Sequence, residues 1–297
     1  MSTPPPSAST DQDTAPGPTI GLVGLGLLGS ALGERLLEQG LEVIGRDVSP
    51  EACERFADSG GRAAESLAEI AACPQIILSL PTSTIGRDVI AELAPLLCSG
   101  TAIIDTTTGA PADAEAAADT LARSGVEYLD ATVGGSSGQA RRGEAIVMCG
   151  ATDAGFTRCR RTLDRLAQQV FHTGPPGSGS RMKLVTNLVL GLNRAVLAEG
   201  LAFAESQGLD AAAALSVLQA GPAASQVMAT KGRRMIDRDF APEARLRQHA
   251  KDVGLILAEA QTGDLELPLS ELHSALLQRL IDRGLGDLDN SAIREAF

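Results

Sequence analysis

Two polar side chains interrupt an otherwise aliphatic stretch in the middle of the chain. Residues 182–192 read MKLVTNLVLGL, with Lys183 and Asn187 four positions apart. Because a helix places residues four apart on one face, the ammonium and the amide should lie together. Burial lowers the pKa of an ammonium, and a lysine near neutrality can exchange a proton with an oxygen. The spacing favours acid–base chemistry, and the alternative is a lysine that reaches solvent from an otherwise buried helix.

A glycine-rich turn near the start of the chain could bind a dinucleotide. In TIGLVGLGLLGSALGERLLEQG, Gly24, Gly26 and Gly29 follow an apolar run and open an amphipathic stretch. The first glycine allows a tight turn, the second lets a pyrophosphate approach the backbone, and the third lets the helix pack on the strand. The amide N–H groups that begin the helix would then face the phosphates.

An acidic residue at the end of the second apolar run favours NAD over NADP. Asp47 closes LEVIGRD, 18 residues after Gly29. A carboxylate at this position accepts hydrogen bonds from the adenosine ribose and repels a 2′-phosphate. Arg46 leaves NADP open as the alternative, because its guanidinium could turn toward that phosphate.

Apolar runs alternate with amphipathic stretches through the first part of the chain, which predicts a Rossmann-type, doubly wound parallel sheet covered by helices. The expected strands are 19–24, 41–47, 75–81, 101–106, 126–131 and 145–151. The expected helices between them are 27–39, 50–58, 84–93, 112–124 and 154–168.

The pattern changes near FHTGPPGSGS, where Gly, Pro and Ser cluster. Beyond it, apolar residues recur at helical spacing, and helices are expected at 181–207, 211–220, 223–237, 246–262 and 269–283. We therefore expect a dinucleotide-binding domain over 19–180 and an all-helical substrate and oligomerisation domain over 181–297. The Pro-, Ser- and Thr-rich residues 1–18 are expected to form a disordered tail.

The composition argues against several kinds of binding partner and against a metal site. The 297 residues carry a net charge of −12, which argues against nucleic acid or an anionic membrane as a partner. Five cysteines without CxxC spacing indicate reduced thiols in the cytoplasm, and the three histidines lack the spacing of metal ligands. No secretory signal and no uncharged apolar run of about 18 residues is found, so no membrane span is expected.

Taken together, the motifs resemble those of the β-hydroxyacid dehydrogenase family, which includes 3-hydroxyisobutyrate dehydrogenases, tartronate semialdehyde reductases and glyoxylate/succinic semialdehyde reductases. The resemblance extends from Ile20 to about Phe297. It is carried by GLGLLG (24–29), LPTS (80–83), DTTT with Pro111 (105–111), DATVGGSSGQARRGEA (130–145), GSGSRMKLVTN (177–187) and HAKD (249–252).

The resemblance implies hydride transfer between a nicotinamide and a small β-hydroxy acid or its semialdehyde, in a homodimer or homotetramer. It implies that Lys183 is the catalytic acid–base and that Asn187 assists it. The substrate would be bound by Gly134, Gly135, Ser136 and Asp252. The residues expected at the cofactor are Gly24, Gly26, Leu27, Leu28, Gly29, Arg46, Asp47, Leu80, Pro81, Thr108, Phe240 and Lys251.

The chain departs from the family pattern at the segment expected to bind the substrate's acid group. Thr132 replaces a proline and Gly134 a serine of the usual DAPVSGG, and Thr186 replaces the first of two paired asparagines. The backbone N–H groups of Gly134 and Gly135, with the Ser136 hydroxyl, are then expected to hold the carboxylate. These changes leave the identity of the acid open.

Three alternatives can be compared with this assignment. A 6-phosphogluconate-type oxidative decarboxylase would need several cations at a phosphate site. Imine reductases share the expected fold but lack the lysine. A non-catalytic dinucleotide-binding scaffold would be expected to lack Lys183 and to carry basic additions, whereas this chain keeps the lysine and is acidic.

Overall fold

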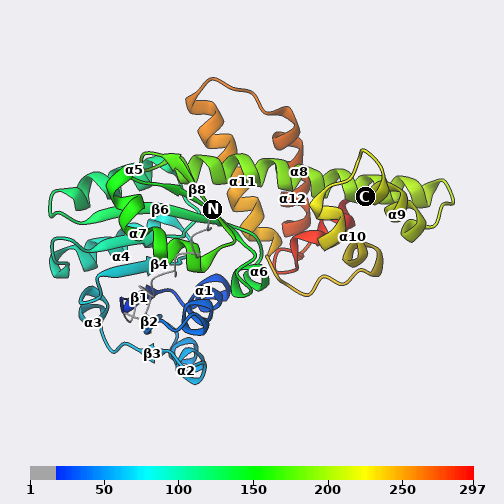
Figure 1. Cartoon of the computed structure of the whole chain (residues 1–297). Coiled ribbons are helices and arrows are strands. Elements are labelled where there is room, and N and C mark those ends of the chain that lie inside the picture. The colour runs from blue at the N-terminus through cyan, green and yellow to red at the C-terminus, as the bar shows by residue number, and fades with distance from the viewer. Residues whose placement is uncertain (1–17) are drawn as a thin grey trace, which may run out of the picture.

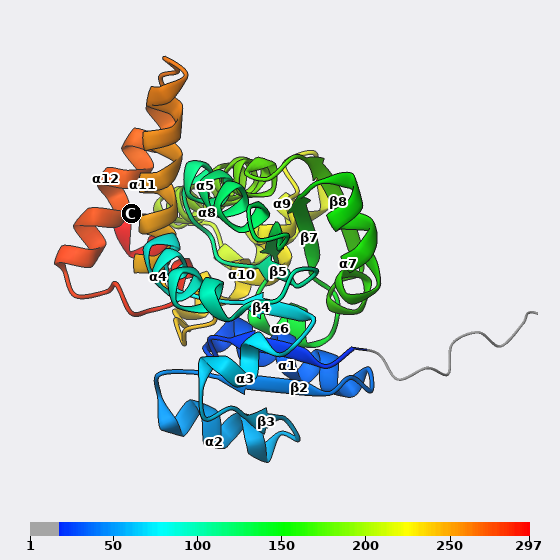
Figure 2. The same ribbon diagram turned by 90° about the vertical axis from the view of Figure 1, so that its left-hand side faces the viewer.

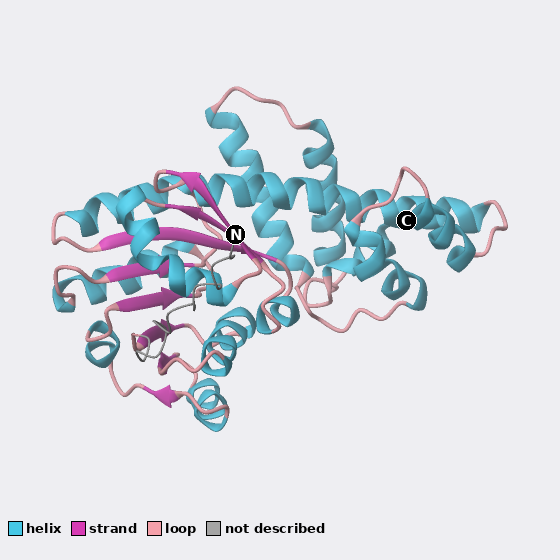
Figure 3. Ribbon diagram, viewed as in Figure 1, coloured by secondary structure: helices cyan, strands magenta, loops and turns pink. Residues whose placement is uncertain are grey.

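The computed structural model describes residues 18–297, in which a mixed eight-stranded sheet is followed by a helical half (Figures 1 and 3). The expected tail, residues 1–18, lies outside the described residues except for Pro18. The sheet has the order β3-β2-β1-β4-β5-β6-β7-β8. Its strands are β1 (Ile20–Val23), β2 (Val43–Arg46), β3 (Arg62–Ala63), β4 (Gln75–Leu78), β5 (Ala102–Asp105), β6 (Glu127–Gly134), β7 (Ile146–Gly150) and β8 (Gln169–Gly174).

Helices cover both faces of the sheet, as expected for a doubly wound fold. One face packs against α1, α2 and α7, whose Leu32, Phe56 and Leu163 are fully or almost fully buried. The other face packs against α3, α4 and α5 through side chains such as Ile70 and Leu93. These helices, with the short α6 and η1, are α1 (Leu27–Glu38), α2 (Pro50–Asp58), α3 (Leu67–Ala71), α4 (Ser83–Leu93), η1 (Ala94–Leu96), α5 (Pro111–Ala122), α6 (Ser137–Arg141) and α7 (Asp153–Leu166).

The sheet is not wholly parallel, which corrects one feature of the prediction. Strands β1 to β6 pair in parallel, but β7 runs antiparallel to β6, and β8 pairs in parallel with β7. An apolar run shows that a strand is buried but does not show its direction. The short connection through α6, residues 135–145, returns the chain antiparallel because it has no room for a full crossover helix.

The helical half consists of α8 to α12 and a terminal 3-10 turn. Its elements are α8 (Ser178–Ser206), α9 (Ala211–Ala220), α10 (Gln226–Asp237), α11 (Leu246–Thr262), α12 (Pro268–Asp282) and η2 (Asn290–Ala296). The longest, α8, begins over the sheet and continues to the far end of the helical half (Figure 1). Helices α11 and α12 pack on each other, and their loop end projects beyond the rest of the molecule in both views (Figures 1 and 2).

The first turn of α8 is fixed to strand β6. The Asp130 carboxylate accepts hydrogen bonds from the backbone N–H groups of Gly177 at 2.9 Å and Ser180 at 2.6 Å. Burial raises the pKa of Asp130 to about 6, although these hydrogen bonds favour its ionised form. The Thr132 hydroxyl donates to the Gly179 carbonyl at 3.0 Å, so the threonine that departs from the family pattern also joins β6 to this helix.

Helix α8 is long and apolar enough to cross a membrane when judged by length and composition alone, whereas the sequence led us to expect no such segment. In the most apolar window of this helix, 44% of the residues are buried. The helix packs against β6, β7, α10 and α11. A core helix of this kind meets the same length and composition criteria, so they are weak evidence for a membrane span.

Candidate active site

A cleft of about 730 Å³ lies where the carboxyl ends of the parallel strands meet the helical half. Ligands of open α/β sheets bind at this edge, where the strand order reverses between β1 and β4. The strand ends contribute Gly24, Asp47, Leu80 and Thr108 to the lining, among others. Side chains of α8 and α11 form much of the opposite wall, so the cleft joins the predicted dinucleotide turn to the predicted catalytic helix.

The glycine-rich turn has the shape that a dinucleotide requires. Gly24 has φ of 93°, and a Cβ there would lie 2.3 Å from the Ser79 carbonyl oxygen. A Cβ at Gly29 would lie 1.9 Å from the Gly24 oxygen, whereas Gly26 has nothing within 4 Å. Gly26 caps α1 without a side-chain acceptor, and the first turn carries no acid. The N–H groups that begin α1 therefore have no side-chain acceptor and are available to a pyrophosphate, and the residues fit the group.

Asp47 and Arg46 point in different directions. The Asp47 carboxylate accepts hydrogen bonds from the backbone N–H groups of Leu25 at 2.6 Å and Ser49 at 2.9 Å, which fixes it beside the glycine-rich turn. The Arg46 guanidinium donates to the carbonyls of Ala64 and Glu65, at 3.2 and 2.7 Å. Both residues line the cleft, but the guanidinium is already engaged by the backbone that follows β3.

The Lys183 amine lies beside the end of β6. Its Nζ donates to the Val133 carbonyl at 2.7 Å, and the residue lines the cleft. Burial lowers the pKa of Lys183, the negative charge of Asp252 opposes this shift, and the positive charges of Arg194 and Lys251 add to it. The result is an ammonium that gives up its proton more readily than an exposed lysine does.

Asn187, Asp252 and Lys251 form a chain of polar contacts between α8, α11 and the sheet. The Asn187 Nδ2 donates to Asp252 Oδ2 at 3.0 Å, and Lys251 Nζ lies 3.2 Å from Asp252 Oδ1. Lys251 also donates to the carbonyl of Thr108 at 2.8 Å and to that of Pro81 at 3.4 Å. This lysine therefore connects the helical half to the two loops that follow β4 and β5.

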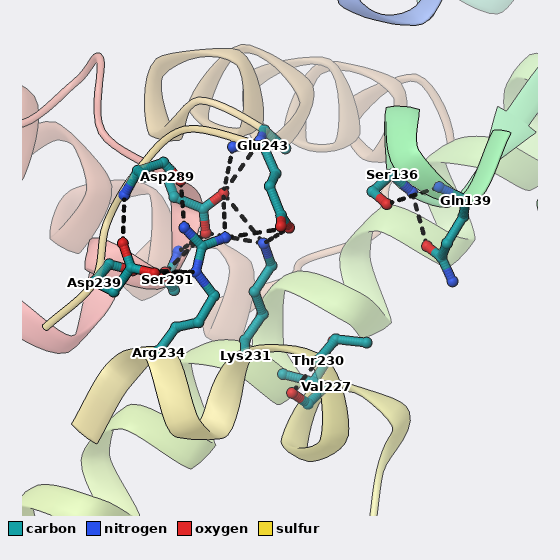
Figure 4. A network of polar contacts seen from close by, with 12 residues as sticks. Ser136, Gln139, Val227, Thr230, Lys231, Arg234, Asp239, Glu243, Asp289 and Ser291 are labelled. Carbon is teal, nitrogen blue, oxygen red and sulfur yellow. Dashed lines mark hydrogen bonds and ion pairs between the residues drawn. The ribbon is translucent and has the colours of Figure 1, made fainter. Parts of the chain in front are cut away.

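The segment expected to bind an acid group turns sharply after β6. Gly135 has φ of 140°, where a side chain would be strained. Ser136 begins α6 with a capping box, in which its hydroxyl accepts from the Gln139 N–H and its own N–H donates to the Gln139 side chain (Figure 4). The Ser136 N–H is therefore already used, while its hydroxyl hydrogen is still free to donate. Gly135 and Ser136 line the cleft together with Ser137.

Two histidines packed against α8, one of them (His249) also lining the cleft, are held in the neutral form. Burial, with the charge of Arg194, lowers the pKa of His273 to about 4, and it also lowers that of His249 well below its usual value. The rings stack obliquely, with centroids 5.1 Å apart, against Gly191 of α8. A Cβ at Gly191 would lie 2.5 Å from His249 Nε2, so this position needs a glycine to let α11 pack closely.

The cleft brings together most of the residues that the sequence singled out. They are Gly24, Gly26, Leu27, Leu28, Gly29, Arg46, Asp47, Leu80, Pro81, Thr108, Gly135, Ser136, Lys183, Asn187 and Asp252. Lys251 contacts the same loops through its hydrogen bonds. Among the described residues that line the cleft, Gly134 and Phe240 do not appear.

Both exceptions have a structural reason. Gly134 is the last residue of β6 and pairs with Ile146 of β7, whose side chain occupies the space beside it. Phe240 packs against the hydrophobic core of the helical half, and its carbonyl accepts from the Asp289 N–H at 3.0 Å. The expected contacts of these two residues with substrate and cofactor therefore remain predictions that the lining of the cleft does not support.

Some groups of the cleft gave little or no local signal in the sequence. The Val133 carbonyl is a backbone group, so no side-chain pattern reveals it. Arg194 lies three turns beyond Lys183 on α8, and Asn290 comes from the far end of the chain. The helical spacing from Lys183 to Arg194 could have indicated a shared face, whereas only the fold brings Asn290 to the cleft.

Comparison with known proteins agrees with this geometry. Residues 19–174 match the family described as the NAD binding domain of 6-phosphogluconate dehydrogenase. Residues 177–297 match the family described as the NAD-binding domain of NADP-dependent 3-hydroxyisobutyrate dehydrogenase. The two matches together cover both halves of the structure.

Individual relatives are similar along almost their whole length. 2-(Hydroxymethyl)glutarate dehydrogenase of Eubacterium barkeri is 30% identical over 92% of this chain and 93% of its own. L-Threonate dehydrogenase of Cupriavidus necator is 28% identical over 94% of this chain and 95% of its own. The crystal structure of a 3-hydroxyisobutyrate dehydrogenase from Salmonella typhimurium has a TM-score of 0.87 and 29% identity, and covers 95% of this chain and 100% of its own.

The fold, the cleft and these matches define an oxidoreductase that uses a nicotinamide dinucleotide. The chain belongs to the β-hydroxyacid dehydrogenase family. It is an NAD(P)-dependent enzyme that acts on small hydroxy acids or the corresponding semialdehydes. This assignment agrees with the resemblance found in the sequence and excludes the non-catalytic scaffold.

Proposed function

We propose that the protein catalyses the reversible oxidation of a small β-hydroxy acid with Lys183 as the acid–base group. In oxidation, the neutral amine takes the hydroxyl proton while a bound nicotinamide supplies the hydride chemistry. In reduction, the ammonium returns the proton to the carbonyl oxygen. The observation that carries the proposal is the 2.7 Å contact between Lys183 Nζ and the Val133 carbonyl, which holds the amine in the cleft beside Gly135 and Ser136.

The other predicted residues complete this assignment. Residues 19–180 would bind the dinucleotide, and residues 181–297 would supply the acid–base group and contacts between subunits. Gly135 and the Ser136 hydroxyl would hold the carboxylate of the acid, Asn187 would orient the reacting group, and Asp252 would position Asn187. The loops carrying Leu80, Pro81 and Thr108 would contact the cofactor beyond its adenosine half.

We infer that NAD is preferred over NADP. The Asp47 carboxylate is fixed beside the glycine-rich turn by two backbone N–H groups. A 2′-phosphate there would meet a like charge. The Arg46 guanidinium, which could have offset that charge, donates instead to the Ala64 and Glu65 carbonyls.

We also propose a homodimer or homotetramer in the cytoplasm. Val196 and Phe203 of α8 are 65% and 66% exposed, as expected of apolar residues that a second copy covers. The five cysteines are free, which suits a reducing compartment. Sedimentation equilibrium would give the mass of the assembly, and Phe203→Asp should reduce it.

The decisive experiment for the reaction compares the wild type with Lys183→Met. The purified proteins would be assayed with 3-hydroxyisobutyrate, glycerate, 4-hydroxybutyrate and threonate, each with NAD and with NADP. Lys183→Met should still bind NADH and should lose turnover by about 10³-fold or more, within the range of general acid–base catalysis. Turnover within about threefold of the wild type would contradict the role of Lys183, and higher kcat/KM with NADP would contradict the cofactor preference.

A further inference from the structure

A buried guanidinium lines the cleft without a partner. Arg194 is 5% exposed and is one of the residues of α8 that form the wall of the cleft. Within residues 18–297, no hydrogen bond or ion pair to its guanidinium is found. Arginine is almost never fully buried unless it is paired, because an unpaired charge loses its hydration. The side chain therefore has unused capacity to bind an anion.

The two carboxylates whose charges act on Arg194, those of Asp289 and Asp252, already have other partners. Asp289 binds Lys231 at 3.0 Å and also accepts from the hydroxyl of Ser291 at 2.8 Å (Figure 4). Asp252 accepts from Asn187 and lies next to Lys251. Neither carboxylate forms an ion pair with the guanidinium, although both act on it over a longer distance.

The charge of Arg194 persists at neutral pH. Burial lowers the pKa of Arg194 to about 10, and the charges of Asp289 and Asp252 oppose that shift. A guanidinium with this pKa is still cationic at pH 7. Its charge reaches the centre of the site, since it contributes to the lowered pKa values of Lys183 and His249.

Arg194 lies on the same face of α8 as the proposed acid–base group. Lys183, Asn187 and Arg194 are separated by four and seven positions, which a helix places on one stripe. The Cα atoms of Lys183 and Arg194, the first and the last of the three, are about 16 Å apart along the helix axis, at 1.5 Å per residue. The Arg194 side chain leans toward the N-terminus of the helix, toward Asn187. The space in front of Gly191, between them on this face, is filled by the rings of His249 and His273, so the cleft reaches Arg194 along the wall that includes Leu190 and His249.

We propose that Arg194 binds a second carboxylate of the substrate. The substrate is then a hydroxy dicarboxylate in the direction of oxidation, and in the direction of reduction it is the aldehyde with the same carbon skeleton and the same two carboxylates. This inference rests on the proposed function and deepens it. The first carboxylate would lie at Gly135 and Ser136, the hydroxyl at Lys183, and the second carboxylate farther along α8. A planar guanidinium matches a carboxylate through two parallel N–H···O bonds. One unpaired guanidinium balances one charge, which favours a carboxylate over a doubly charged phosphate.

The test compares non-reactive acids that differ only at the distal end. The NADH-bound protein would be titrated by calorimetry with glutarate against pentanoate and with succinate against butyrate, because in each pair a methyl group replaces one carboxylate. We expect the wild type to bind at least one diacid about 10- to 100-fold more tightly than the monoacid of the same pair. This ratio of dissociation constants is the range expected for a hydrogen bond to a charged group. Equal or undetectable binding of both members in both pairs would overturn the proposal.

Substitutions of Arg194 test whether this residue causes the preference for diacids over monoacids. Arg194→Met should bring the ratio of the two dissociation constants to within about twofold of one, and Arg194→Lys should reduce it by at least threefold because the paired donors are lost. Arg233→Met removes an exposed guanidinium of α10 that pairs only with Asp237 among the described residues, and it should keep the ratio. A preserved ratio in Arg194→Lys, or in folded Arg194→Met, would overturn the proposal.

NADH affinity and turnover separate this inference from the proposed function. If Arg194 instead held the cofactor, Arg194→Met would weaken NADH binding and leave the diacid preference intact, which would refute the subsite. If Lys183→Met kept turnover while the preference depended on Arg194, the proposed acid–base role would fall and the subsite would stand.

Discussion

The Asn187 side-chain nitrogen lies 3.0 Å from Asp252 Oδ2, so the amide next to the proposed acid–base lysine is held by a residue of α11. Both residues are buried. Because the nitrogen donates to Asp252 and Asn187 lines the cleft, the amide oxygen is left as the acceptor that a substrate could use. The contact fixes the orientation of an amide that would otherwise be free to rotate.

Asn187→Ala should reduce kcat by about 10- to 100-fold, which corresponds to the loss of one or two hydrogen bonds involving a charged group. Steady-state kinetics with a substrate identified in the acid screen would measure this change. Thr186→Val is the matched control, because the Thr186 hydroxyl donates to the Lys183 carbonyl of its own helix at 2.9 Å. Equal kcat values in Asn187→Ala and the wild type would contradict the role of the amide.

Asp252→Asn should shift the pH dependence of oxidation to lower pH. Oxidation needs the neutral amine, so its rate rises with pH up to the pKa of Lys183. Burial lowers this pKa, and the charge of Asp252 raises it. Removing that charge should lower the pKa further, and the rising limb of kcat/KM should move with it. Glu259→Gln removes a carboxylate of α11 that pairs with Arg181 and should leave the limb in place. A limb displaced to higher pH would contradict this electrostatic account.

Lys251→Met should weaken the connection between the helical half and the cofactor loops. The Lys251 amine donates to the Thr108 carbonyl at 2.8 Å, and its loss removes a charge-assisted hydrogen bond. We expect the dissociation constant of NADH to rise about tenfold. Hydrogen exchange should also become faster in residues 80–83 and 106–110. Lys251→Arg should restore part of the affinity, and unchanged NADH binding in Lys251→Met would exclude the proposed connection.

Asp289 should make the stability of the fold sensitive to acid. Burial alone would raise the pKa of Asp289, but Lys231 and the Ser291 hydroxyl and N–H overcome this and lower the pKa to about 2. Its contribution is therefore complete above the unfolded pKa near 4 and is lost as the pH falls toward 2. The part of the unfolding free energy that is lost between those two pH values is about 2 kcal/mol, at 1.36 kcal/mol for each pKa unit.

Asp289→Asn should lower the free energy of unfolding at pH 7 and show a smaller further loss between pH 4 and 2. Urea unfolding at a series of pH values would measure both effects. Asp287→Asn is the control, since Asp287 is largely exposed and pairs with Arg247 at the surface. An acid-induced loss as large in Asp289→Asn as in the wild type would contradict the assignment to Asp289.

The regular elements of the fold could largely be predicted because they depend on local periodicity. The helix predicted at 50–58 agrees with α2, and that at 211–220 agrees with α9. Strand β3 has two residues, and strand β8 is mainly exposed or half-buried, so neither produces an apolar run. The direction of β7 depends on the length of a connection, which the composition of the strand does not record.

The site was predictable where a motif carries its own geometry. The glycine-rich turn and the four-residue spacing of Lys183 and Asn187 are examples. The match of Phe240 rested on residue type at one position, whereas its packing against the helical core depends on the fold. Asn290 was missed because it reaches the cleft through contacts between residues far apart in the chain, such as the bond from its N–H to the Ala244 carbonyl at 2.8 Å.

The fixed start of α8 determines which parts of the enzyme can vary independently. Asp130 and Thr132 fasten this end of the helix to β6, so the amine of Lys183 keeps its place relative to the nucleotide-binding frame. In the part of the chain that the structure describes, no hydrogen bond joins the turns of α8 beyond Thr186 to the sheet. If the second carboxylate binds at Arg194 as proposed, exchanges at that distal end would change the length of the acid that fits and leave the position of Lys183 unchanged.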